Sequence, residues 1–150
     1  MSQDIERFAA LLHRSAALWR VKLDERLRPW GMTQAAWRTL WLLRAAEERF
    51  NQSQLALRLG IETPTLVRIL DRMEKRELIR READSQDRRQ KYLALTAAGL
   101  ALVEEIDAVV QDMRRRMLAG LSDKELQAGI ALFEKIQSNA GSLAPSKQAN

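Results

Sequence analysis

The chain has 150 residues, of which 46% are hydrophobic, 5% aromatic and 30% charged, which is typical of a helix-rich globular domain with its own core. Its formal net charge of +5 is expected of a protein that binds a polyanion. The absence of cysteine excludes disulfides, cysteine–zinc sites and thiol-based redox switches.

The N-terminal third of the chain has the periodicity of helices. Residues from about Asp4 to Leu27 predict one long amphipathic helix, which the segment Arg28-Pro29-Trp30-Gly31 ends. Thr33 is the expected N-cap of a second helix that continues to about Glu47. The predicted apolar residues of the two helices are Ile5, Phe8, Leu12, Trp19, Leu23, Leu27, Trp37, Leu40, Trp41 and Leu43.

A short helix and a longer one follow. Residues 48–52 are predicted to form a turn, and residues 53–59 a short helix that Gly60 ends. In the next helix, Thr63 is the expected N-cap and Pro64 the expected first helical residue. The two helices together predict a helix-turn-helix. In the second, Leu66, Ile69, Leu70 and Met73 form the buried stripe, and Thr65, Arg68, Arg72 and Lys75 form the opposite polar face.

The polar face of that second helix has two interpretations. Most charged helix faces are simply solvated. Here, however, short hydroxyl side chains come first and Arg68 follows about one turn later, an order that allows the leading turns to enter the major groove of DNA. An arginine in this position can pair with guanine O6 and N7.

A basic hairpin is predicted after this helix. Residues 79–83 and 92–95 read as two short strands, and the polar segment between them contains Asp87, Arg88 and Arg89. A carboxylate can hold a guanidinium in one direction, and an arginine directed from a hairpin tip fits a narrow, electronegative minor groove. Helix and hairpin together predict a winged helix.

Two further helices complete the chain. Thr96 is the expected N-cap of a long helix, and Ser122 to Glu125 form a capping box that begins the last one. Arg114, Arg115 and Arg116 near the end of the first of these helices are expected to oppose the helix dipole. Residues 141–150 are small and polar and predict a flexible tail.

These motifs resemble the MarR family of bacterial transcriptional regulators, and most closely its SlyA-like branch. The resemblance covers roughly Leu11 to Ile136. It rests on Met32-Thr33-Gln34 with Trp37, Gln54-Leu55-Ala56, Gly60-Ile61-Glu62, Thr65-Leu66-Val67-Arg68, Glu77-Leu78-Ile79-Arg80, Asp87-Arg88-Arg89 and Leu95-Thr96. At Glu77 the chain departs from the family, many of whose members have a glycine at the end of the recognition helix.

The resemblance implies a mainly α protein with a small β-hairpin wing, that is, a winged helix-turn-helix flanked by N- and C-terminal dimerisation helices. We expect a single domain over residues 1–140, with the winged helix at about 33–96 and dimerisation helices at about 4–28 and 97–140. Such a protein is a homodimer that binds double-stranded, pseudo-palindromic operator DNA. By position, Thr63, Pro64, Thr65 and Arg68 match the recognition-helix contacts, Arg89 matches the wing-tip arginine and Asp87 the acid that holds it.

The chain's own size also favours a dimer. A chain of 150 residues has too little core to cover three long apolar stripes, so an isologous partner is expected to bury the terminal helices. The family often releases DNA when a small phenolic or carboxylic ligand binds beside these helices. The candidate residues for such an aromatic carboxylate are Trp19, Arg20 and Trp37, although core packing is the simpler role of both tryptophans.

Other functions have little support in the sequence. The only histidine is His13, and no motif indicates a metal, a cofactor, a phosphate loop or a catalytic pair. The sequence therefore predicts no enzyme, no cofactor and no membrane segment, and a cytoplasmic location. The alternative is a winged-helix module that binds another protein, without sequence-specific DNA binding. The Asp87-Arg88-Arg89 tip argues against that alternative, because a protein-docking wing has no need of a guanidinium that a carboxylate directs.

Overall fold

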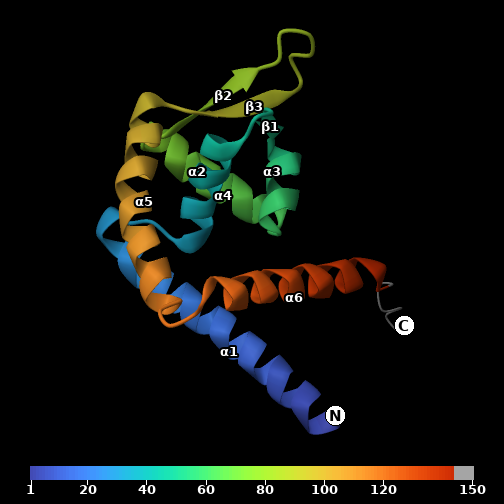
Figure 1. Ribbon diagram of the computed structural model, residues 1–150. Helices are drawn as coiled ribbons and strands as arrows, with labels where there is room; N and C mark the ends of the chain where they lie inside the picture. The colour runs from blue at the N-terminus through green and yellow to red at the C-terminus, as the bar shows by residue number, and fades with distance from the viewer. Residues whose placement is uncertain (144–150) are drawn as a thin grey trace. The chain divides into compact units, whose positions relative to one another are not determined.

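The computed structural model describes residues 1–143 (Figure 1). Contacts divide the chain into two compact units, residues 1–115 and the residues from 116 onward. In chain order the elements are α1 (Ser2–Leu27), the 3-10 turn η1 (Arg28–Trp30), α2 (Gln34–Ala45), β1 (Phe50–Asn51), α3 (Gln52–Leu59), α4 (Thr63–Lys75), β2 (Ile79–Ala83), β3 (Lys91–Leu95), α5 (Ala97–Met117) and α6 (Asp123–Ser142). The mainly helical winged helix-turn-helix with N- and C-terminal helices is confirmed.

The core of the first unit forms where α2, α3 and α4 meet the end of α1 and the middle of α5. Trp37, in α2, is its largest fully buried side chain and is only 1% exposed. Buried positions recur three or four residues apart on each helix, as the apolar periodicity predicts. The other fully buried apolar side chains are Leu27, Leu40, Leu55, Leu66, Leu70, Ile79, Val103, Ile106 and Val110.

The helix-turn-helix consists of α3 and α4. Asn51 caps α3 through a capping box with Gln54, in which each side chain accepts a hydrogen bond from the other residue's backbone N–H. Gly60 ends α3 in the left-handed conformation, with φ +66°, which a glycine adopts without steric cost. Only Ile61 and Glu62 then separate Gly60 from α4, so the turn between the helices is tight.

The wing is a three-stranded antiparallel sheet in the order β1-β3-β2. In Figure 1 the β2–β3 hairpin projects beyond the cluster of α2, α3 and α4. The strands β2 and β3 match their prediction closely, whereas β1 lies in a segment for which the sequence predicts a turn, and that prediction is wrong. A two-residue strand has no alternation to detect, and β1 exists because Phe50 and Asn51 pair with Leu93 and Tyr92 of β3.

Thr96 joins the wing to α5. Its hydroxyl accepts a hydrogen bond from the backbone N–H of Gly99 (3.0 Å), so Thr96 caps α5 as predicted. The same hydroxyl donates to the carbonyl oxygen of Glu77 (2.6 Å), and the backbone N–H of Thr96 donates to the carbonyl oxygen of Leu78 (3.1 Å). The base of the wing is thus fixed to the segment that follows α4.

The second unit contains α6. Ser122 and Glu125 form the predicted capping box, and backbone hydrogen bonding there lowers the pKa of the Glu125 carboxyl group. The helix continues to Ser142 and has no buried residue, and most of the predicted tail lies outside the described residues. The single domain over residues 1–140 stays a prediction. Among the described helices, none is long and apolar enough to cross a membrane.

Candidate nucleic-acid interface

The helix α4, which the sequence predicts to be a recognition helix, begins one residue earlier than predicted. Glu62, not Thr63, is the N-cap: its backbone is extended (φ −72°, ψ 146°), and its carbonyl oxygen accepts the N–H of Leu66 (3.1 Å). Thr63 is therefore the first helical residue and Pro64 the second, which corrects both predictions. The Glu62 side chain makes no capping hydrogen bond, so its residue type does not predict that Glu62 is the N-cap.

The first two turns of α4 present polar side chains to solvent. Thr63, Pro64 and Arg68 are exposed and Thr65 is half-buried, whereas Leu66, on the other face, is fully buried. This helix is the most strongly amphipathic in the described part of the chain, because its buried and exposed residues separate cleanly around the axis. Short exposed side chains followed by an arginine can approach base edges in a major groove.

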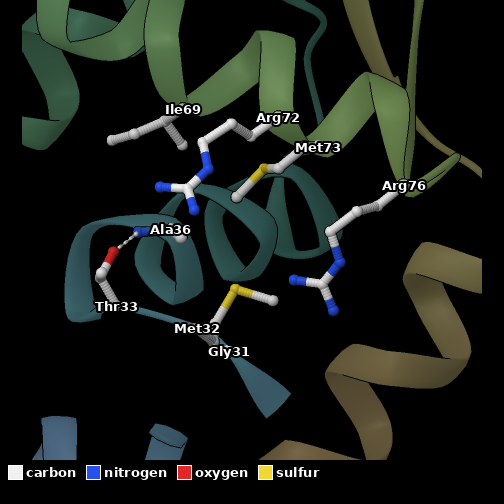
Figure 2. Close-up of a pocket in the computed structure, with 8 residues that line it drawn as sticks. All are labelled: Gly31, Met32, Thr33, Ala36, Ile69, Arg72, Met73 and Arg76. Atoms are coloured by element: carbon white, nitrogen blue, oxygen red, sulfur yellow. Dashed lines mark hydrogen bonds between the residues drawn. The ribbon is translucent and has the colours of Figure 1, made fainter.

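Arg72 lies at the border between this exposed face and a pocket. The α2–α4 pocket, as we name it, is lined by Gly31, Met32, Thr33, Ala36, Ile69, Arg72, Met73 and Arg76. Figure 2 shows the guanidinium groups of Arg72 and Arg76 extending from α4 toward the start of α2. Arg76 also donates a hydrogen bond to the carbonyl oxygen of Trp30 (3.1 Å). The pocket thus combines two cations with the apolar surface of both methionines.

The end of α4 is held in a conformation that normally selects glycine. The N–H of Leu78 donates to the carbonyl of Met73 (3.0 Å) and the N–H of Glu77 to that of Glu74 (2.9 Å), which is the hydrogen-bond pattern of a Schellman motif. Glu77 occupies the left-handed position of this motif with φ +58°. The helix therefore ends where a glycine would end it, and the cost is local strain at Glu77.

The wing turn, residues 84–90, is organised by two aspartates. Asp84 accepts a hydrogen bond from the backbone N–H of Gln86, and Asp87 accepts one from the backbone N–H of Arg89, each at 3.0 Å. These short side-chain-to-backbone bonds are typical of tight turns. The hydrogen bond that the structure shows for the Asp87 carboxylate is thus from the backbone N–H of Arg89 and not from its guanidinium. Arg88 and Arg89 are both exposed.

A second group of charges extends across the sheet, from β2 over Tyr92 of the central strand β3 to Arg49, which precedes β1. Glu82 accepts a hydrogen bond from Arg80 Nε (2.7 Å) and lies 3.8 Å from Arg49. The hydrogen bond from Arg80 is the main reason that the pKa of the Glu82 carboxyl group is lowered; burial opposes the shift and the two positive charges add to it. Arg49 also lies over the Tyr92 ring, 5.6 Å from its centre.

The ligand residues predicted from the sequence do not line the α2–α4 pocket. Trp37 is buried in the core, Trp19 is half-buried against it and Arg20 is exposed on α1. Their role in ligand binding stays a prediction. In the part of the chain that the structure describes, no group of three or more histidine, cysteine or carboxylate side chains could hold a metal ion.

One residue that connects the wing to α4 could not be identified from the sequence. Arg81, in β2, donates one hydrogen bond to Glu74 (2.7 Å) and one to Asp71 (2.9 Å). Asp71 and Glu74 lie three residues apart, a spacing that places them on one face of α4. Arg81 reaches that face because of the path of β2 after α4 and its pairing with β3. The sequence pattern alone therefore does not indicate that Arg81 contacts α4.

Comparisons with known proteins agree with this geometry. Residues 30–90 match the model of the MarR family. The transcriptional regulator PA3341 is 34% identical, with a TM-score of 0.83 over 91% of this chain and 99% of that chain. The S. aureus MepR–DNA complex is 28% identical, with a TM-score of 0.80 over 88% and 97% of the two chains. A mutant of E. coli MarR complexed with operator DNA is 25% identical, with a TM-score of 0.79 over 91% and 97%.

The structural resemblance extends over most of this chain and nearly the whole of each of the three relatives. The residues that match the family model include the helix-turn-helix, β2 and the wing turn. Regulators of this family are DNA-binding proteins and not enzymes, which agrees with the exposed polar face of α4. The chain belongs to the MarR family of DNA-binding transcriptional regulators.

Proposed function

We propose that this regulator binds pseudo-palindromic operator DNA as a homodimer and acts as a repressor or an anti-silencer. The observation that supports it best is the presence, on one compact unit, of an exposed polar helix start and an ordered wing turn that exposes two arginines, Arg88 and Arg89. On the residues quoted above we place it in the SlyA-like branch, and because it acts on chromosomal DNA we place it in the cytoplasm.

The uncovered apolar residues of the terminal helices support the homodimer. Ile5 (63%) and Phe8 (44%) in α1 are substantially exposed, as are Ile130 (57%) and Phe133 (50%) in α6. Large apolar side chains that recur along a helix and face water mark an interaction surface. A second copy of the chain supplies a matching surface by symmetry, so that each dimer presents two recognition helices about 34 Å apart, one turn of DNA.

We propose distinct roles for helix and wing. Thr65 and Arg68, with Thr63 and Pro64, read the major groove, and Arg72 contacts the backbone beside it. Arg89 enters the minor groove, Asp87 fixes the turn that carries it, and Arg88 pairs with phosphate. We therefore expect Arg89→Ala to weaken sequence preference only at the flanks of the operator, and Arg68→Ala to weaken it at the centre of each half-site.

An aromatic carboxylate or phenol is the proposed effector. DNA binding by Bordetella bronchiseptica BpsR, a protein of the same fold, is regulated by 6-hydroxynicotinic acid. The set Trp19, Arg20 and Trp37 is one candidate site. The α2–α4 pocket is the other, and Arg72 and Arg76 favour it, because two guanidinium groups beside apolar side chains suit an aromatic anion (Figure 2).

The pocket also offers a reason for release. A ligand lowers the affinity for DNA only if it binds the DNA-free form better. In the proposed complex Arg72 pairs with a DNA phosphate. A ligand carboxylate that pairs with Arg72 therefore competes with that phosphate for the same guanidinium group. Arg76→Ala should then raise the concentration of salicylate needed for half-release, whereas Arg20→Ala should do so if the first candidate set is the site.

The experiment that tests the proposed function is a fluorescence-anisotropy titration of a labelled duplex from the promoter region of the protein's own gene. A scrambled duplex of the same composition serves as the control, and both are measured at low and moderate salt, with and without salicylate. We expect tight binding to the promoter duplex with a steep salt dependence from counterion release. Equal and weak binding to both duplexes would contradict the proposal.

A further inference from the structure

Two adjacent arginines of β2 have different environments. Arg80 is 58% exposed and pairs with Glu82 on its own strand, whereas Arg81 is only 21% exposed and pairs with two carboxylates of α4. Successive side chains of a strand point to opposite faces of the sheet, so the side chains of Arg80 and Arg81 point in opposite directions. The two residues are neighbours and carry the same charge. Arg80 is therefore a matched control for Arg81.

The contacts of Arg81 use both arms of its guanidinium. Nη1 lies 2.7 Å from Glu74 Oε2 and Nη2 lies 2.9 Å from Asp71 Oδ1. Burial lowers the pKa of Arg81, but the hydrogen bonds and negative charges of Glu74 and Asp71 outweigh it and raise the pKa. A planar guanidinium fork can hold two carboxylates in fixed directions, which a single ammonium group cannot do.

The position of this pairing determines what it can control. The base of the wing is fixed by the hydrogen bonds of Thr96 to Glu77 and Leu78. Arg81 lies further along β2, opposite Leu93 of β3, on the way to the wing turn. On its other side the hairpin is attached through β3, whose Leu93 and Tyr92 pair with Phe50 and Asn51 of β1. Arg81 adds a direct attachment of β2 to α4, and this attachment limits the tilt of the hairpin relative to that helix.

We propose that Arg81 is a positioning residue for DNA reading: by binding Asp71 and Glu74 it holds the wing at one angle to the recognition helix, so that Arg68 and Arg89 reach their grooves together. Arg81 itself does not contact DNA. This inference rests on the proposed function, in which helix and wing both read one operator. Its consequence is specific, because a tilting wing loses the flanks of the operator but leaves the recognition helix in place.

The test measures base preference at two places. The probes are duplexes selected by the wild-type protein from random sequence, and variants of them substituted either at a half-site centre or at the flank positions whose preference Arg89→Ala abolishes. Arg81→Met should lower the flank preference by about fivefold or more while the preference at the half-site centre is retained. Arg80→Met, which removes the same charge, should keep both preferences and weaken binding to all duplexes alike.

A second variant separates position from charge. Asp71→Asn combined with Glu74→Gln removes the two negative charges that pair with Arg81 and so makes α4 more positive overall. It should bind all duplexes more tightly and still lose the flank preference. Arg81→Lys should retain the flank preference only in part, because an ammonium group cannot hold both carboxylates in fixed directions. Since lysine keeps the positive charge, this variant can replace Arg81→Met in the test if Arg81→Met does not fold.

The outcomes separate the inference from the function on which it rests. A wild-type protein without any sequence preference would overturn both. A wild-type protein with a flank preference that Arg81→Met and the double variant retain would overturn the inference alone, and Arg81 would then contribute only charge.

Discussion

Gly99, in the first turn of α5, lies directly against the backbone carbonyl group of Leu78. A Cβ atom at Gly99 would overlap the carbonyl oxygen of Leu78, and it would also crowd the side chain of Leu95. The same carbonyl oxygen accepts the N–H of Thr96 (3.1 Å), so it cannot move without loosening the base of the wing. This close approach, together with the hydrogen bonds of Thr96, holds the segment after α4 against the start of α5.

Gly99→Ala is expected to destabilise the fold. Forcing a methyl group into this contact should lower the free energy of unfolding by about 1–3 kcal/mol, the usual cost of overpacking. Chemical denaturation followed by circular dichroism measures it. Gly141→Ala is the control, because Cβ at Gly141, also in a helix, meets no atom within 4 Å. Equal stability of wild type and Gly99→Ala would show that the two backbones are not in close contact.

Glu77→Gly is expected to stabilise the protein. Glu77 has φ +58°, a conformation that costs a residue with Cβ about 1–2 kcal/mol, and the flexibility of glycine in the unfolded chain offsets part of the gain. We expect an increase of about 0.5–1 kcal/mol in the free energy of unfolding, measured by urea denaturation. Gly60→Ala, at the corresponding position of α3 with φ +66°, should have the opposite sign. A decrease for Glu77→Gly would mean that its side chain is needed.

The contribution of Glu82 to stability should depend on pH. Its pKa is lowered in the folded protein, chiefly by the hydrogen bond from Arg80. A carboxyl group with a lowered pKa contributes stability above its unfolded pKa, about 4.3, and that contribution is lost as the pH falls through the folded value. Glu82→Gln should therefore melt at a lower temperature than wild type at about pH 7, and the difference should vanish in acid. A difference in melting temperature that is the same at both pH values would exclude this role.

The terminal helices should determine the oligomeric state. Phe8→Asp or Phe133→Asp replaces an exposed apolar side chain, which we expect the partner to bury, by a charged one. Sedimentation equilibrium should then give a monomer, and affinity for the two-half-site operator should fall by about a hundredfold or more, since the two recognition helices are no longer linked. Leu57→Asp, at an 83% exposed leucine of α3, should remain dimeric. If the Phe8 and Phe133 variants also stay dimeric, the interface lies elsewhere.

Much of the fold could be predicted because its signals are local. The hydroxyl side chains of Thr33, Thr96 and Ser122 predict N-caps, and all three accept the expected hydrogen bonds. At α4 the same reasoning fails, because Thr63 has the right side chain but Glu62 has the N-cap backbone and makes no side-chain hydrogen bond. Local side-chain chemistry thus predicts that a helix is present more reliably than it predicts the residue at which the helix begins.

The non-local parts could not be predicted in this way. The strand β1 depends on pairing with β3, which lies far along the chain, and its own two residues have no pattern. The contacts of Arg81 depend on the path of β2 past α4. In the wing turn the sequence places Asp87 beside Arg89, but only the structure shows that the carboxylate binds the backbone N–H and so shapes the turn.

The most direct test of sequence-specific reading by α4 is selection of duplexes from random sequence by the wild-type protein and by Arg68→Ala. We expect wild type to select a two-fold symmetric site with half-sites about one DNA turn apart. Arg68→Ala should lose preference at one symmetric pair of positions, with a cost of roughly 1–3 kcal/mol in binding, and keep the flanks read by the wing. The same selected site and the same affinity for both proteins would contradict the placement of the recognition helix.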